Sequence, residues 1–145
     1  MGAYTINVKA TIPQVNPLTL LDWEANFSFV FDVRHDCTTS TITDKAIANM
    51  SFVIGTTAAT QDATFEDAIS TAHSNSAYCG AKVLTLTPTY SFVTISGTNI
   101  VLSTSNPADV GGPISMKLTV ALADPNYAAV PVLTKLFTVT ITCAT

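Results

Sequence analysis

The chain contains an internal repeat, which restricts its fold more than any other feature of the sequence. Residues 2–12 match residues 112–122 at a constant offset of 110, with apolar side chains at the same alternate positions. Residues 29–33 match residues 137–141 at an offset of 108, because the intervening loops differ by two residues. Alternation with a period of two predicts a strand with one face on a core. Each copy therefore predicts a pair of β-strands.

The repeat divides the chain into two parts. A cysteine follows each copy, Cys37 after the first and Cys143 after the second. We expect residues 38–143 to form one complete domain, and residues 1–37 to be the last two strands of a preceding or partner module. A two-stranded ribbon cannot bury its apolar face alone. The first copy therefore needs something to pack on: upstream strands, another chain or the following domain.

Composition favours an all-β fold and excludes some partners. Apolar residues make up 48% of the chain and charged residues only 11%. The polar remainder is rich in Thr, whose branched side chain packs well on a pleated sheet and is restricted in a helix. The net charge is −4 and the six basic residues are scattered. Nucleic acid is not an expected partner, because a phosphate backbone requires clustered positive charge.

Membrane insertion is not expected either. No segment approaches the roughly twenty apolar residues of a membrane-spanning helix. The residues after Met1 lack the basic start and apolar block of a secretory signal. We expect the natural N-terminus to lie upstream of Met1 or to have been trimmed.

Further strands are expected inside the complete domain, at a spacing typical of a β-sandwich. They are residues 39–43, 49–54, 82–87, 92–95 and 99–103. Residues 105–112 predict a turn cluster, because Pro107 fixes φ while Gly111 and Gly112 permit positive φ. Residues 61–69 sustain no helical periodicity and are expected to form a loop.

Two stretches of the chain, residues 1–37 and about 92–143, resemble a known class of module. Residues 106–111, a long alternating strand, a proline-containing loop and residues 137–143 are similar to the C-terminal half of cadherin-like and immunoglobulin-like modules. Such modules stand in tandem in extracellular surface proteins. The resemblance implies an all-β, immunoglobulin-like (cadherin-like) antiparallel β-sandwich, preceded by two C-terminal-type strands of another module. Tyr4 matches an aromatic common in these modules, whereas the second copy has Ile114, and the calcium-ligand clusters of cadherin junctions are missing.

The three cysteines support a disulfide interpretation. Cys37 and Cys143 occupy equivalent positions of the repeat. One interpretation pairs Cys37 with Cys79 inside the domain and leaves Cys143 for a neighbouring module or chain. A disulfide closing such a loop contributes about 3–4 kcal/mol. The alternative is three buried thiols. No metal site is expected, because C-x-x-C spacing is absent and His35 and His73 make a poor ligand set.

Two sequons begin at Asn26 and Asn49 and are candidate N-glycosylation sites for a protein secreted from a eukaryote. Trp23 lies at the end of an unusually apolar connecting segment, and exposed apolar loops commonly mark a contact. We expect Trp23 to pack at a module or subunit interface, with stacking on a sugar as the alternative. The interface candidates are Tyr4, Ile6, Val8, Leu20, Trp23, Phe29 and Phe31.

Neither catalytic activity nor a cofactor is expected. Catalysis needs a nucleophile with a base, or paired carboxylates in a cleft. Asp32, His35 and Asp36 are close in sequence, but they stand at a strand end of the repeat, and a solvated strand exit is expected there. Glu66 and Asp67 are adjacent, so extended backbone would point them apart, and both are expected to face water.

The leading hypothesis is an extracellular or cell-surface structural or adhesive module. Its partners would be copies of itself or adjacent modules, joined through strand pairing into a linear array or filament. One alternative is a carbohydrate-binding module of a secreted protein. Another is a viral or phage structural subunit, which would have a complete reading frame from Met1 and neither disulfides nor glycans.

Overall fold

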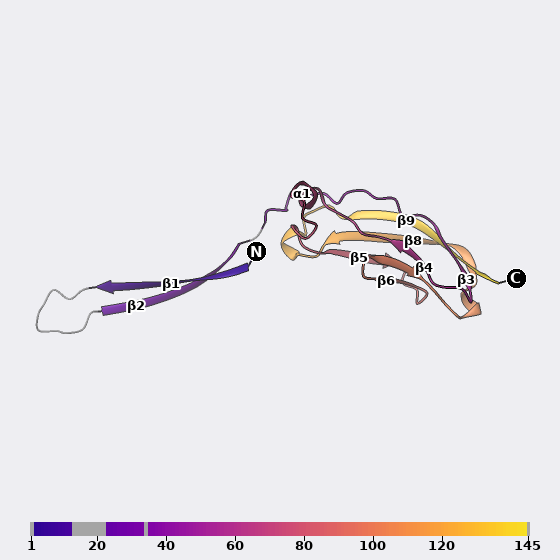
Figure 1. Ribbon diagram of the computed structural model, residues 1–145, viewed down its shortest axis with the longest axis horizontal. Coiled ribbons are helices and arrows are strands. Elements are labelled where there is room, and N and C mark those ends of the chain that lie inside the picture. Colours follow the sequence, from indigo (N-terminus) through magenta and orange to yellow (C-terminus); the bar gives the residue numbers. More distant parts are fainter. Residues whose placement is uncertain (1, 13–22, 34, 145) are drawn as a thin grey trace, which may run out of the picture. The chain divides into compact units, whose positions relative to one another are not determined.

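The chain forms two compact units, residues 1–35 and residues 36–145 (Figure 1). The computed structural model describes residues 2–12, 23–33 and 35–144. The division lies two residues before the expected domain boundary, so Cys37 belongs to the second unit. We call residues 1–35 the hairpin unit and residues 36–145 the complete unit.

The hairpin unit consists of β1 (Gly2–Ile12) and β2 (Trp23–Val33), which pair antiparallel. The strands of the complete unit are β3 (Met50–Ile54), β4 (Ala59–Asp62), β5 (Lys82–Thr87), β6 (Val93–Ser96), β7 (Asn99–Leu102), β8 (Gly111–Leu122) and β9 (Leu133–Cys143). Its helical elements are α1 (Ala68–Ala72) and the short 3-10 turns η1 (Pro107–Asp109) and η2 (Pro125–Tyr127). The expected all-β class is confirmed.

The complete unit is a two-layer β-sandwich. One sheet has the strand order β3-β9-β8-β5 and the other has the order β4-β7-β6. Both sheets contribute to a shared hydrophobic core, in which Leu118 and Val139 of the first sheet and Ile100 and Leu102 of the second are fully buried. The fold therefore excludes water from one face of each sheet.

The alternation noted in the sequence produces this core. Met116, Leu118 and Val120 of β8 are buried, whereas the residues between them are partly or fully exposed. In β9, Phe137 and Val139 are likewise buried, and Thr138 between them is partly exposed. The two strands of the second repeat copy therefore form the centre of the larger sheet.

Some elements differ from expectation. Residues 39–43 form no strand, and only Ile42 makes an isolated bridge, with Asp67. Residues 61–69 are not a plain loop, because β4 ends inside this stretch and α1 begins there. The purely antiparallel arrangement is wrong at one edge, where β3 pairs parallel with β9. A long connection separates these two strands along the chain, as parallel pairing requires.

Candidate interaction surface

The two copies of the repeat pair their strands in the same register. Ile6 lies opposite Phe29 in the hairpin unit, and the matching residues Met116 and Phe137 lie opposite each other in the complete unit. The same offsets of 110 and 108 match the other pairs. Val8 lies opposite Phe27, and the matching residues Leu118 and Lys135 lie opposite each other. The hairpin unit therefore has the pairing geometry of β8 and β9.

The hairpin unit has one apolar and one polar face, because residues directly opposite each other in a sheet share a face. We call the first the apolar face. Its described side chains are Tyr4, Ile6, Val8, Ala10, Ala25, Phe27 and Phe29. The opposite, polar face carries Thr5, Asn7, Lys9, Thr11, Asn26, Ser28 and Val30.

The apolar face is exposed, although its counterpart is the core of the complete unit. Ile6 is 41% exposed and Phe29 is 51% exposed, whereas the matching Met116 and Phe137 are 1% and 3% exposed. Phe27, at 60%, is more exposed still. A face with the pattern of a sandwich core is thus open to solvent.

The structure describes the side chains of four of the seven interface candidates. Tyr4, Ile6, Val8 and Phe29 are exposed on the apolar face. Phe31 and Trp23 belong to β2, but their side chains lie outside the described residues, as does all of Leu20. The sequence reasoning missed Phe27, although its alternate position before Phe29 was a usable signal.

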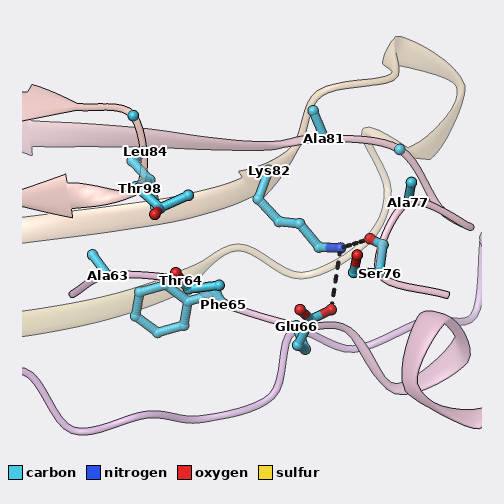
Figure 2. A pocket seen from close by; sticks show the side chains of 12 residues that line it. Ala63, Thr64, Phe65, Glu66, Ser76, Ala77, Ala81, Lys82, Leu84 and Thr98 are labelled. Carbon is cyan, nitrogen blue, oxygen red and sulfur yellow. Dashed lines mark hydrogen bonds and ion pairs between the residues drawn. The ribbon is translucent and has the colours of Figure 1, made fainter. Parts of the chain in front are cut away.

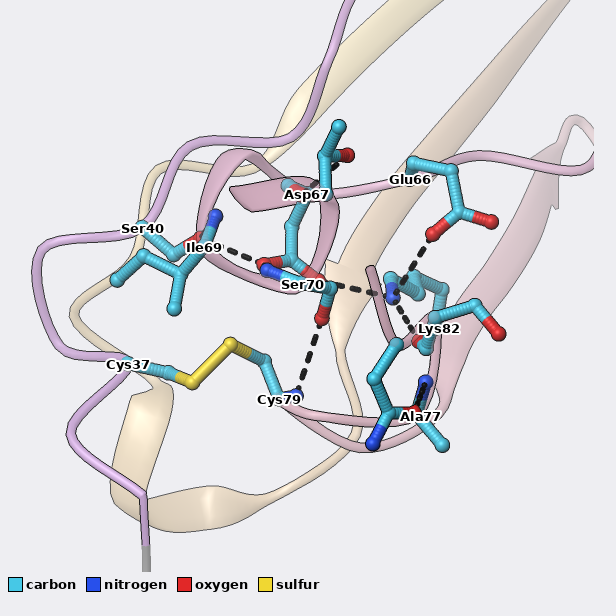
Figure 3. Close-up of polar contacts among 12 residues, drawn as sticks. Cys37, Ser40, Glu66, Asp67, Ile69, Ser70, Ala77, Cys79 and Lys82 are labelled. Carbon is cyan, nitrogen blue, oxygen red and sulfur yellow. Dashed lines mark hydrogen bonds and ion pairs between the residues drawn. A yellow bond between two sulfur atoms is a disulfide. The ribbon is translucent and has the colours of Figure 1, made fainter. Parts of the chain in front are cut away.

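The predicted Cys37–Cys79 disulfide is present (Figure 3). The two Cα atoms are 5.7 Å apart and both residues are buried. Cys143, at the end of β9, is an exposed free thiol. The alternative of three buried thiols is therefore wrong.

A buried ion pair lies beside this disulfide. Asp67 is fully buried, and its Oδ2 atom is 2.9 Å from Nζ of Lys82. Its Oδ1 atom accepts hydrogen bonds from Ser40 Oγ at 2.8 Å and from Ser70 N at 2.9 Å. Burial alone would raise the pKa of Asp67, but the bonds from Ser70, Lys82 and Ser40 outweigh it and hold the pKa well below its ordinary value.

The expectation that Asp67 faces water is wrong. Asp67 is the N-cap of α1, and capping requires its carboxylate to turn back onto the backbone N–H of Ser70. That turn directs the side chain into the unit. The neighbouring Glu66 is partly exposed, with its carboxylate 3.9 Å from Lys82 Nζ.

A hollow of about 350 Å³ adjoins the same lysine (Figure 2). Phe65 and Leu84 supply apolar walls, and Lys82 reaches across to donate to the carbonyl oxygen of Ser76 at 2.9 Å. The amine of Lys82 is thus engaged with two carboxylates and one carbonyl. These contacts of Lys82 connect the loop before β5 to the segment before α1.

The strand exit contains an ordinary solvated turn. Asp36 is exposed, and its Oδ1 atom accepts hydrogen bonds from the side chain and backbone of Thr38 at 2.6 and 3.2 Å. These bonds lower the pKa of Asp36. The side chain of Asp32 lies outside the described residues.

Both sequon asparagines are exposed. Asn26 lies on the polar face of the hairpin unit, so a glycan there would leave the apolar face uncovered. Asn49 uses its Oδ1 atom to accept a hydrogen bond from Thr138 N at 2.9 Å, while a glycan would attach through Nδ2.

Within residues 2–12, 23–33 and 35–144, no group of three or more His, Cys, Asp and Glu side chains is placed to hold a metal ion. In that part of the chain, no helix has the length and apolar character needed to cross a membrane. Comparison with models of protein families, with curated proteins and with solved structures gives no match.

Proposed function

We propose that the chain is a non-enzymatic, extracellular structural or adhesive building block. It joins copies of itself or adjacent modules into a linear array through the hairpin unit. The single observation that carries this proposal is the exposed apolar face, whose register is that of a core-forming strand pair. Large contiguous apolar surfaces on soluble proteins mark interaction sites.

The strand order supports an immunoglobulin-like type for the complete unit. In constant-type immunoglobulin domains one sheet holds strands C, F and G and the other holds B, E and D with A. The neighbours β5-β8-β9 and β4-β7-β6 follow this order. The first strand, β3, pairs with the last strand rather than with β4. The module is thus proposed to be cadherin-like or immunoglobulin-like.

Covering the apolar face would supply a useful binding energy. Burying an aliphatic or aromatic side chain contributes about 1.5–3 kcal/mol. The four side chains Ile6, Val8, Phe27 and Phe29 are already about half covered, so burying the remainder offers on the order of 3–6 kcal/mol before the entropy cost of association. Burial of the apolar face therefore favours a contact between modules.

The disulfide and the free thiol support an extracellular array. Disulfides persist in oxidising compartments, and the Cys37–Cys79 bridge is compatible with one. Cys143 stands where Cys37 stands in the repeat, and it is exposed. We propose that Cys143 pairs with a cysteine of a neighbouring module or chain. The bridge also counts against the viral alternative, for which no disulfide was expected.

The proposal is tested by the association state of the full chain. In the absence of another partner, apolar faces of different molecules should cover one another. Sedimentation velocity should therefore show concentration-dependent association, which Phe29→Asp should abolish. Val30→Asp is the matched control, because Val30 is 64% exposed but lies on the polar face. A monomeric wild type, or equal effects of both variants, would contradict the proposal.

A further inference from the structure

We infer that the hairpin unit is recognised by an incomplete sandwich of this chain's own type, one with counterparts of β3 to β7 but no final strand pair. In that sandwich β1 and β2 would take the places of β8 and β9. This inference rests on the proposed function and names the partner and the mode of docking.

The covering surface is argued from the complete unit. There, the core side of β8 and β9 is covered by the sheet β4-β7-β6, whose Ile100, Leu102 and Val93 are buried in the same core. The apolar face presents comparable side chains in the same register, with Ile6 in place of Met116 and Phe29 in place of Phe137. The surface that fits it is therefore a sheet of the β4-β7-β6 kind.

The outer edges of β1 and β2 further restrict which partner can dock. In the complete unit, the outer edge of β8 pairs antiparallel with β5 and the outer edge of β9 pairs parallel with β3. Within the described residues, β1 and β2 form a sheet of two strands, so both outer edges remain available for strand addition. A partner that offers a β5-type strand, a β3-type strand and a covering sheet satisfies the face and both edges together.

One position of the apolar face differs in chemistry from its counterpart in the complete unit. Phe27 corresponds to Lys135, which forms an ion pair with Asp44 at the rim of the complete unit. A phenylalanine cannot pair with a carboxylate. The partner's counterpart of Asp44 is therefore expected to be apolar or neutral rather than acidic.

The test uses a tandem chain in which residues 36–110, with Asp44→Asn so that no carboxylate faces Phe27, are fused directly in front of Met1 of the full sequence. The offset of 110 places Met1 where Gly111 stands, so no linker is needed. The added residues supply β3 to β7 without β8 and β9. Hydrogen exchange read by mass spectrometry should show the amides of β1 and β2 exchanging at least about 100-fold more slowly than in the full chain.

Variants make the readout specific to the apolar face. Phe29→Asp in the tandem chain should restore fast exchange in β1 and β2, whereas Val30→Asp should leave the protection in place. Exchange in β8 and β9 reports the folding of the original complete unit in every variant. Because the apolar face is occupied, the tandem chain should also lose the concentration-dependent association of the full chain.

The outcomes separate the inference from the proposed function. If the full chain associates through Phe29 but β1 and β2 stay unprotected in the tandem chain, the docking mode is overturned and the assembly role stands. If the tandem chain protects β1 and β2 while the full chain remains monomeric, the docking mode stands and self-association of this chain is overturned. Protection unaffected by Phe29→Asp would overturn the docking mode.

Discussion

At the scale of single residues, the buried pair of Asp67 and Lys82 is the most consequential arrangement of the complete unit. A buried carboxylate is tolerated only where a cation and hydrogen-bond donors offset its lost hydration. Asp67 has both, through Lys82, Ser40 and Ser70. The pair connects the start of α1 to the start of β5, next to the disulfide (Figure 3).

Removal of the lysine should be costly. Lys82→Met leaves Asp67 buried and charged without its cation, and this should lower the free energy of unfolding by about 3–5 kcal/mol. Chemical denaturation followed by circular dichroism measures the loss. Lys45→Met is the control, because the partner of Lys45, Asp62, is largely exposed. A comparable loss in both variants would contradict the assigned importance of the buried pair.

The same carboxylate predicts how stability depends on pH. The pKa of Asp67 is lowered from 3.8 in the folded chain, so the unfolded chain binds the proton more tightly. The stabilisation is complete above about pH 5 and declines as the pH falls below about 4. Asp62, whose pKa Lys45 and Thr64 lower to about 2, acts in the same direction. The free energy of unfolding of Asp67→Asn, measured by urea denaturation, should fall less steeply with decreasing pH than that of the wild type. An equal pH dependence in both proteins would refute the lowered pKa of Asp67.

Sequence reasoning did not find this pair, for a physical reason. Glu66 and Asp67 are neighbours, and in extended backbone neighbours point apart, so both were expected in water. The helical turn that buries Asp67 is five residues long, too short for periodicity to reveal. Its partner Lys82 lies on a strand that only the tertiary fold brings near. The signal that was present was a capping residue, Asp67, three residues before Ser70.

At the scale of elements, most strands were predictable, the four-residue β6 and β7 among them, whereas the four-residue β4 was not. Residues 82–87 were expected as a strand and form β5, and the repeat placed β1, β2, β8 and β9. β4 was missed because its four residues, Ala59–Asp62, carry small and polar side chains that give no clear alternation. The expected strand at residues 39–43 is absent. Alternation over many residues is informative, whereas over four residues it is common by chance.

The entry into β8 depends on a glycine. Gly112 has φ of +118°, and a Cβ atom there would lie 2.7 Å from the carbonyl oxygen of Val139. That oxygen belongs to the paired strand β9 and cannot move without breaking the sheet. Gly112→Ala should therefore lower the free energy of unfolding by more than about 2 kcal/mol.

Gly97→Ala is the control for this substitution. Gly97 has φ of +60°, but a Cβ atom there would meet no atom within 4 Å. The control should cost about 1 kcal/mol, the penalty of left-handed backbone alone. Thermal unfolding of the two variants measures the difference. Equal losses would show that the close approach of β9 is unimportant.

At the scale of the whole molecule, the cysteines report on how the chain is built. The isolated chain, before Cys143 is bonded to a neighbour, should contain one thiol that reacts rapidly with a thiol reagent, because Cys37 and Cys79 are bridged. Cys143→Ser should remove this reactivity without changing stability. Replacing Cys37 and Cys79 by serine should lower the free energy of unfolding of the complete unit by about 2–5 kcal/mol. Thiol titration with intact mass measurement checks the count, and three reactive thiols would contradict the bridge.

The parallel edge pair determines how the complete unit would respond to tension. β3 and β9 are its first and last strands, and they pair side by side over five residues, from Met50 with Val139 to Ile54 with Cys143. Force applied at the two ends of the unit pulls parallel strands in opposite directions along their common axis. The hydrogen bonds between them are then loaded in shear and must break together rather than unzip singly. An array of such units would yield abruptly, at the force that ruptures the whole edge.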